Sequence, residues 1–132
     1  MYTYSIVVQF EDIDSYGIIH HPKVLYYMER ARVNFFNDNG ISIKTEKNGL
    51  VLRNINIQLK SQILMFDTLI LELTTKHIDT YRFTFHYEIK RSGKLMTVSE
   101  TEMVIINLET KKLIPIPEHI LKVLKQIQSD AQ

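Results

Sequence analysis

The stretch of sequence that decides the fold lies near the start of the chain and reads Phe10-Glu11-Asp12-Ile13-Asp14-Ser15-Tyr16-Gly17-Ile18-Ile19-His20-His21-Pro22. Before it, residues 2–10 place apolar side chains at alternate positions, which is typical of a strand. After it, residues 23–39 carry apolar side chains at helical spacing. An acidic loop therefore leads directly into the N-terminus of a helix, where unpaired backbone N–H groups point outward.

The helix is predicted from four apolar positions spaced by four, three and four residues: Val24, Met28, Ala31 and Phe35. Leu25 and Phe36 widen this stripe. Pro22 suits the first helical turn, because the N–H that proline lacks would be unpaired there. Gly40 can adopt the left-handed conformation that commonly ends a helix.

The rest of the chain is mostly strand. Alternating patterns predict strands over 51–59, 69–73, 81–90 and 95–108, with a hairpin turn at Ser92-Gly93 and a short terminal helix over 118–128. One long helix wrapped by about five mostly antiparallel strands is an α+β architecture. We expect the outer face or an edge of this sheet to be available for self-association.

Composition limits the class of protein. The 132 residues are predicted to form a single domain, 1–132, and 45% hydrophobic and 23% charged residues are typical of a soluble globular protein. A net charge of +1 does not favour binding to nucleic acid or to an anionic membrane. The absence of cysteine excludes thiolate chemistry. No signal peptide or membrane-spanning segment is apparent, so we expect a cytoplasmic protein without stable membrane insertion.

The three carboxylates of the loop have two interpretations. They can belong to a solvated turn in which Asp12 or Asp14 accepts hydrogen bonds from nearby backbone N–H groups. Alternatively, one of them faces a bound carbonyl group. Asp14 is the better candidate for that role, because Gly17 follows three residues later and allows a close backbone approach. Asp12 directly follows the predicted strand and is expected to orient the loop.

Adjacent histidines suggest metal binding or proton transfer, but neighbouring residues rarely ligate one metal, and no zinc-like spacing is present. We therefore predict no metal site at His20 or His21. The backbone N–H of His21 is the more useful group, because donors at a helix start can hold a developing oxyanion. Glu29 and Arg32 are predicted to form an ion pair along the helix.

The residues 10–32 resemble the signature of the hotdog-fold acyl-CoA thioesterases. The most similar branch is the 4-hydroxybenzoyl-CoA thioesterase type, which includes the bacterial Tol–Pal-associated acyl-CoA thioesterases. The resemblance implies a hotdog fold in which Asp14 is the catalytic aspartate and the His21 amide polarises the thioester carbonyl. Gly17, Pro22 and Tyr26 are then the residues expected to contact substrate.

The resemblance also implies homodimers joined edge to edge through their sheets, often paired into tetramers, with active sites between subunits. No cofactor is expected, because CoA is part of the substrate. Arg53, Arg91 and Lys94 are candidates for contacting the CoA phosphates. The segment 61–64 lacks a proline that many family members carry, so substrate choice is the property on which this chain is most expected to differ.

The function implied is hydrolysis of an acyl-CoA to a free acid and CoA. Asp14 would attack the carbonyl carbon or activate a water molecule, and the sequence does not separate these routes. Two alternatives remain open at this stage. One is a non-catalytic hotdog protein that binds or senses acyl-CoA, and the other is a hotdog dehydratase, which would more naturally use a catalytic histidine with an acidic partner.

Overall fold

The computed structural model describes residues 1–42 and 47–129. Two helices and six strands make up this part of the chain, together with one turn of 3-10 helix, η1. In chain order they are β1 (Tyr2–Val7), η1 (Phe10–Asp12), α1 (Pro22–Asp38), β2 (Asn48–Leu59), β3 (Thr68–Lys76), β4 (Arg82–Arg91), β5 (Lys94–Asn107), β6 (Leu113–Ile114) and α2 (Glu118–Gln126).

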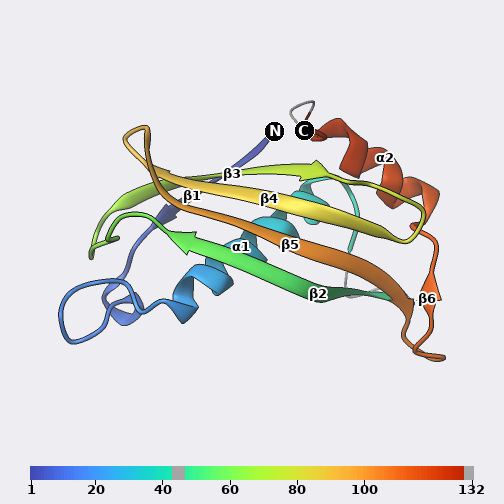
Figure 1. Ribbon diagram of the computed structural model, residues 1–132, viewed down its shortest axis with the longest axis horizontal. Helices are drawn as coiled ribbons and strands as arrows, with labels where there is room; N and C mark the ends of the chain where they lie inside the picture. Colours follow the sequence, from blue (N-terminus) through green and yellow to red (C-terminus); the bar gives the residue numbers. More distant parts are fainter. Residues whose placement is uncertain (43–46, 130–132) are drawn as a thin grey trace.

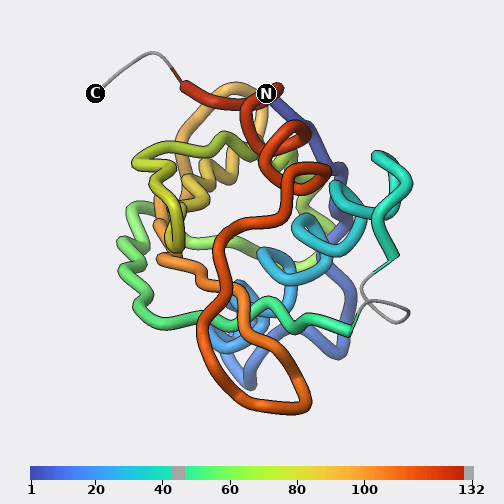
Figure 2. The backbone as a smooth tube through the Cα atoms, turned by 90° about the vertical axis from the view of Figure 1, so that its right-hand side faces the viewer, coloured from blue at the N-terminus to red at the C-terminus, as the bar shows by residue number. Residues whose placement is uncertain are grey.

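The strands form one antiparallel sheet in the order β1-β3-β4-β5-β2, and the short β6 pairs with β5. The long helix α1 lies against one face of this curved sheet (Figures 1 and 2). Ser92 and Gly93, both with positive φ, turn β4 into β5 as the sequence predicts. The α+β class and the arrangement of one long helix with its sheet are confirmed.

The core lies between α1 and the inner face of the sheet. All four residues of the predicted helical stripe are buried, and the inner side chains of β3 and β4 are 0% exposed at alternate positions. Five aromatic rings fill the centre in edge-to-face and tilted contacts: Phe35, Phe36, Phe83, Phe85 and Tyr87. Such rings contribute both apolar burial and specific geometry. This packing fixes the helix on the sheet.

The outer face of the sheet is charged rather than apolar. Its network comprises Glu72, Lys76, His86, Glu88, Lys90 and Glu100. The His86 Nδ1 atom lies 2.8 Å from a Glu100 oxygen and Nε2 lies 3.0 Å from a Glu88 oxygen. The edge strand β2, by contrast, carries three exposed apolar residues, Leu52, Ile55 and Leu59. Of the two surfaces predicted for self-association, the edge is therefore the apolar one.

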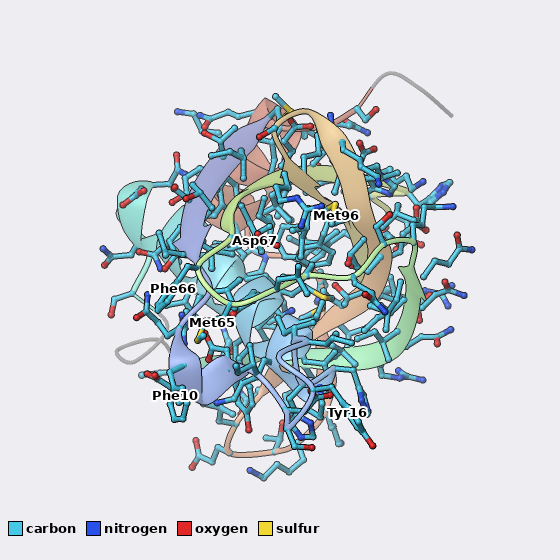
Figure 3. All side chains as sticks on the ribbon, turned by 90° about the vertical axis from the view of Figure 1, so that its left-hand side faces the viewer. Phe10, Tyr16, Met65, Phe66, Asp67 and Met96 are labelled. Carbon is cyan, nitrogen blue, oxygen red and sulfur yellow. The ribbon has the colours of Figure 1, made fainter. Side chains whose placement is uncertain are left out.

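The first strand is shorter than predicted. It ends at Val7 instead of Phe10, because Val8 turns inward and pairs its backbone with Phe66 and Asp67. Phe10 begins η1 and is 74% exposed. It lies at the surface near Phe66 (Figure 3). The alternation of apolar residues continues to Phe10, although the pairing of β1 with β3 ends at Val7.

The two helices differ slightly from the predicted spans. Helix α1 begins one residue earlier and ends one residue earlier than predicted, and α2 ends at Gln126 instead of Gln128. Leu25 does not join the buried stripe, since it is 42% exposed. No helix in the described residues is long and apolar enough to cross a membrane.

Candidate active site at the start of the long helix

Asp12 joins the acidic loop to the helix. Its side chain is 4% exposed, and Oδ2 accepts hydrogen bonds from the Gln9 N–H at 3.0 Å and from the Tyr27 hydroxyl at 2.8 Å. The Lys23 Nζ atom lies 3.8 Å from Oδ1. Since Tyr27 and Lys23 belong to α1, these contacts fix the loop relative to the helix. The predicted orienting role of Asp12 is confirmed by this geometry.

The pKa of the Asp12 carboxyl reflects the same contacts. Burial by itself would raise this pKa, but the Gln9 N–H, the Tyr27 hydroxyl and the Lys23 charge together hold it below its ordinary value. Burial and the hydrogen bond to Asp12 raise the pKa of the Tyr27 hydroxyl in turn. Asp12 is therefore an ionised structural group with no free position for substrate on Oδ2.

The tip of the loop is held by its own backbone and by a neighbouring loop. The Asp14 N–H donates to the Ile18 carbonyl at 2.8 Å, and the His20 N–H donates to the Asp12 carbonyl at 2.8 Å. The Ile19 N–H donates to the Ile63 carbonyl, also at 2.8 Å. These bonds give the loop a defined shape. Tyr16, at its tip, is 85% exposed and points away from the body of the molecule (Figure 3).

Asp14 uses one carboxylate oxygen for the loop and leaves the other free of protein donors. Oδ1 accepts hydrogen bonds from the Tyr16 N–H at 2.8 Å and the Ile18 N–H at 3.3 Å. Among the described residues, no donor lies within hydrogen-bond distance of Oδ2. Both interpretations of the loop thus apply to Asp14, since the same side chain stabilises the turn and presents one free oxygen.

Gly17 is favoured by the conformation of the loop. Its φ is +78°, a conformation that other residues adopt only with strain. A Cβ atom added there would meet nothing within 4 Å. The backbone therefore needs glycine for its conformation, and the predicted approach of a bound group at this position stays a prediction.

His21 and Pro22 form the start of α1. His21 precedes the first helical residue, and Pro22 occupies the first turn as predicted. The Lys23 and Val24 N–H groups bond back to His20 and His21 carbonyls, whereas no acceptor for the His21 N–H is found in the described chain. A free N–H at the positive end of a 17-residue helix can polarise a carbonyl oxygen.

Two grooves adjoin this helix start. The first, which we call the loop groove, has a volume of about 220 Å³ and is lined by Ile18, Ile19, His21 and residues 59–63. The second, the helix groove, has a volume of about 420 Å³. Its lining residues are Pro22, Leu25, Tyr26, Met28, Glu29, Arg32, Leu52 and Ile55. The predicted contact residues Pro22 and Tyr26 therefore line one groove, and His21 lines the other.

Several features of this site were not predicted. The contact between Tyr27 and Asp12 could have been suspected, because Tyr27 lies on the buried face of the helix, one turn after Lys23. The contributions of Leu52 and Ile55 had no local signal, because only the folded sheet brings β2 beside α1. The predicted Glu29–Arg32 ion pair is not among the ion pairs of the described residues; the Arg32 Nη1 atom donates to the Tyr87 hydroxyl at 3.0 Å instead.

The remaining candidates lie away from the helix start or are already engaged. Arg91 forms an ion pair with Asp67 at 2.7 Å, whereas Arg53 and Lys94 are exposed. His86 faces the outer side of the sheet between two glutamates. Within the described ranges, no cluster of three or more histidine, aspartate or glutamate side chains could hold a metal ion.

Comparison with known proteins decides the family. A family model described as the thioesterase-like superfamily matches residues 8–124. The chain belongs to this superfamily. The predicted resemblance is thereby confirmed, and with it the class of thioester hydrolases.

Similar proteins match over almost the whole chain. A putative esterase of Aquifex aeolicus is 28% identical over 127 residues, which cover 94% of this chain and 98% of that protein. A Haemophilus influenzae protein named acyl-CoA thioesterase YbgC is 18% identical over 90% of both chains. The solved structure of a 1,4-dihydroxy-2-naphthoyl-CoA thioesterase from Synechocystis is 23% identical, covers 96% of both chains, and superposes with a TM-score of 0.88.

Replacing Asp12 by Asn should destabilise this member of the superfamily at neutral pH by about 1–3 kcal/mol, the usual contribution of hydrogen bonds to a charged group. Because the folded-state pKa of Asp12 is lowered, its stabilising effect is present above the ordinary pKa of 3.8 and disappears as the pH falls through the folded-state value. Urea unfolding of wild type and Asp12→Asn at pH 7 and near pH 3 measures this difference. The exposed neighbour Glu11 provides the control Glu11→Gln, and an equal loss in the two variants would contradict the role of Asp12.

Proposed function

We propose that the protein hydrolyses acyl-CoA thioesters to a free carboxylic acid and CoA. One observation carries this proposal. The loop presents a carboxylate oxygen of Asp14 and the helix start presents the backbone N–H of His21, and neither group has a protein partner among the described residues. The names of similar proteins, an acyl-CoA thioesterase and a naphthoyl-CoA thioesterase, support the substrate class.

In the proposed reaction, the His21 N–H and the helix dipole bind the thioester oxygen and stabilise the negative charge that develops on it. Asp14 Oδ2 then either attacks the carbonyl carbon or removes a proton from a water molecule that attacks it. The C–S bond breaks and the sulfur leaves as a thiolate. In the first route, water subsequently hydrolyses the mixed anhydride and regenerates Asp14.

The leaving group explains why the site needs few further groups. A thiolate is stable enough to depart without a proton donor, unlike the amine of an amide. The site accordingly offers a carboxylate and an amide donor. In this proposal the loop groove, which is lined by His21 and Lys60, takes the pantetheine arm. The helix groove, which is lined by Pro22 and Tyr26, takes the acyl group.

Asp14→Asn should lower kcat for acyl-CoA hydrolysis by at least about 100-fold, since a nucleophile or general base contributes roughly that much or more. Steady-state hydrolysis of an acyl-CoA panel, followed by thiol release, gives the rates. Asp79→Asn is a matched control, because Asp79 Oδ1 also accepts two backbone N–H bonds in a turn, and the β3–β4 turn lies at the opposite end of the sheet (Figure 1).

Equal rates for wild type and Asp14→Asn would exclude Asp14 as the catalytic residue. Saturable acyl-CoA binding by a wild-type protein that turns over no member of the panel would favour the non-catalytic alternative. Circular dichroism and thermal melting of each variant show whether a lost rate reflects lost folding.

The amide of His21 can be tested by two substitutions at one position. His21→Ala retains the N–H and should change kcat less than 10-fold, whereas His21→Pro removes it and should lower kcat by about 100- to 1000-fold. The φ of −52° at His21 suits proline, so the helix start can keep its conformation. Equal kcat values for folded His21→Ala and His21→Pro proteins would exclude this amide as the oxyanion donor.

We also propose that two copies of the chain join through the free edge of β2. Among the described residues, this 12-residue strand pairs with β5 alone, so its other edge presents N–H and C=O groups without strand partners there. Leu52, Ile55 and Leu59 add exposed apolar surface along it. The charged outer face of the sheet does not offer such a surface.

Ile55→Lys should convert a dimer to a monomer, because it places a charge on the apolar part of the joined edge. Light scattering coupled to size exclusion measures the mass of the particle. Val33→Lys, at an exposed apolar position on α1 outside both grooves, should leave the mass unchanged. A wild-type protein that remains monomeric at all concentrations would refute the proposed interface.

A further inference from the structure

Arg32 is a cation whose protein partners supply no negative charge. Its Nη1 atom donates to the Tyr87 hydroxyl at 3.0 Å, and Tyr87 shares a 2.7 Å hydrogen bond with Thr101. Tyr87 and Thr101 are both fully buried. None of the ion pairs in the described residues includes Arg32. The guanidinium is therefore oriented by neutral groups only.

Burial keeps the Tyr87 hydroxyl neutral. It raises the pKa of this hydroxyl, so Tyr87 stays protonated and cannot serve as a counter-ion for Arg32. A guanidinium has five N–H donors in a fixed plane, and Tyr87 accepts one of them. Because Arg32 is partly buried and lines the helix groove, its remaining donors are open to water or to a bound group. A bound anion could therefore reach the guanidinium without displacing a protein partner.

The helix groove runs from the start of α1 to this cation. Along α1, the lining runs from Pro22, which follows His21, to Arg32. At the usual rise of an α-helix, the distance along the helix axis between these two residues is about 15 Å. Leu25 and Ile55 supply exposed apolar surface between the two ends. An acyl chain of medium length spans this path.

Glu29 lines the same groove, but it is exposed. Its charge is therefore screened by water and salt, whereas Arg32 is partly buried and is screened less. Arg32, not Glu29, sets the charge preference at the inner end of the groove.

We propose that Arg32 binds a carboxylate at the far end of the acyl group, so that the preferred substrates are CoA monothioesters of dicarboxylic acids. The planar guanidinium fork matches a carboxylate in a bidentate manner. The acyl group occupies the helix groove, with its apolar chain on Leu25 and Ile55. This inference rests on the proposed thioesterase function, and it adds the substrate class.

The test compares two substrates of equal chain length, decanoyl-CoA and its ω-carboxyl analogue sebacoyl-CoA. Wild type should have the higher kcat/KM for sebacoyl-CoA. Arg32→Gln, which can still donate to Tyr87 but lacks the charge, should reduce the sebacoyl-to-decanoyl ratio of kcat/KM by about 10- to 100-fold, the effect of one charge-assisted hydrogen bond. Arg30→Gln is the matched control on the same helix, outside the groove, and should leave the ratio unchanged.

Tyr87→Phe tests the positioning of Arg32 independently. It removes the hydroxyl that orients the guanidinium while keeping the ring in the core, so the ratio should fall by less than in Arg32→Gln. In both variants the change should appear in KM for sebacoyl-CoA and not in kcat, because Arg32 lies far from the reacting carbonyl. A merely structural role would instead lower the rates for both substrates together.

Calorimetric binding of the two thioesters to Asp14→Asn protein, which should not consume them, separates this inference from the function. Hydrolysis of decanoyl-CoA with a ratio that Arg32→Gln leaves unchanged would overturn the inference and leave the thioesterase function standing. If wild type hydrolyses neither substrate, the proposed function fails, and tighter binding of sebacoyl-CoA that is lost in Arg32→Gln would still support the inference. Equal binding of the two thioesters would overturn it.

Discussion

The buried carboxylate of Asp12 is the contact on which the geometry of the site depends. Its Oδ2 atom receives a hydrogen bond from the strand end at Gln9 and another from the helix at Tyr27. Other hydrogen bonds between the loop and α1 are local ones at the helix start, such as that from the Lys23 N–H to the His20 carbonyl. Because Asp14 and His21 lie on that loop and at its end, their relative position follows from how firmly Asp12 holds the strand end to the helix.

Two carboxylates separated by one residue have opposite roles because their surroundings differ. Asp12 is buried, and donors from the backbone, a hydroxyl and an ammonium group surround it. Asp14 is partly exposed, and the loop fills only one of its oxygens. A carboxylate that is fully engaged stabilises structure, whereas one with a free, oriented oxygen can react without first breaking a hydrogen bond. In the proposed mechanism, the loop thus assigns the structural role to Asp12 and the chemical role to Asp14.

The order of elements could be predicted from the sequence because each depends on local periodicity. The stripe through Val24 and Met28 marks the helix, and the alternation through Phe83 and Phe85 marks the strand on which it packs. The end of β1 could not be predicted, since it is set by where β3 stops pairing and not by the pattern around Phe10. Local spacing also suggested an ion pair for Arg32, which tertiary packing replaced with a bond to Tyr87, a residue 55 positions away.

The same principle separates the predictable from the unpredictable parts of the site. Asp14, Gly17, His21 and Pro22 are close in sequence, and their arrangement follows from loop and helix-start chemistry. The walls of the helix groove come from α1 and β2, which the chain brings together only through the complete sheet. Pairing of two β2 edges would supply acceptors and donors to the open strand and would also cover the exposed apolar residues beside α1. One association would then satisfy the sheet edge and exclude water from the reacting carbonyl, which strengthens the hydrogen bond from the His21 amide.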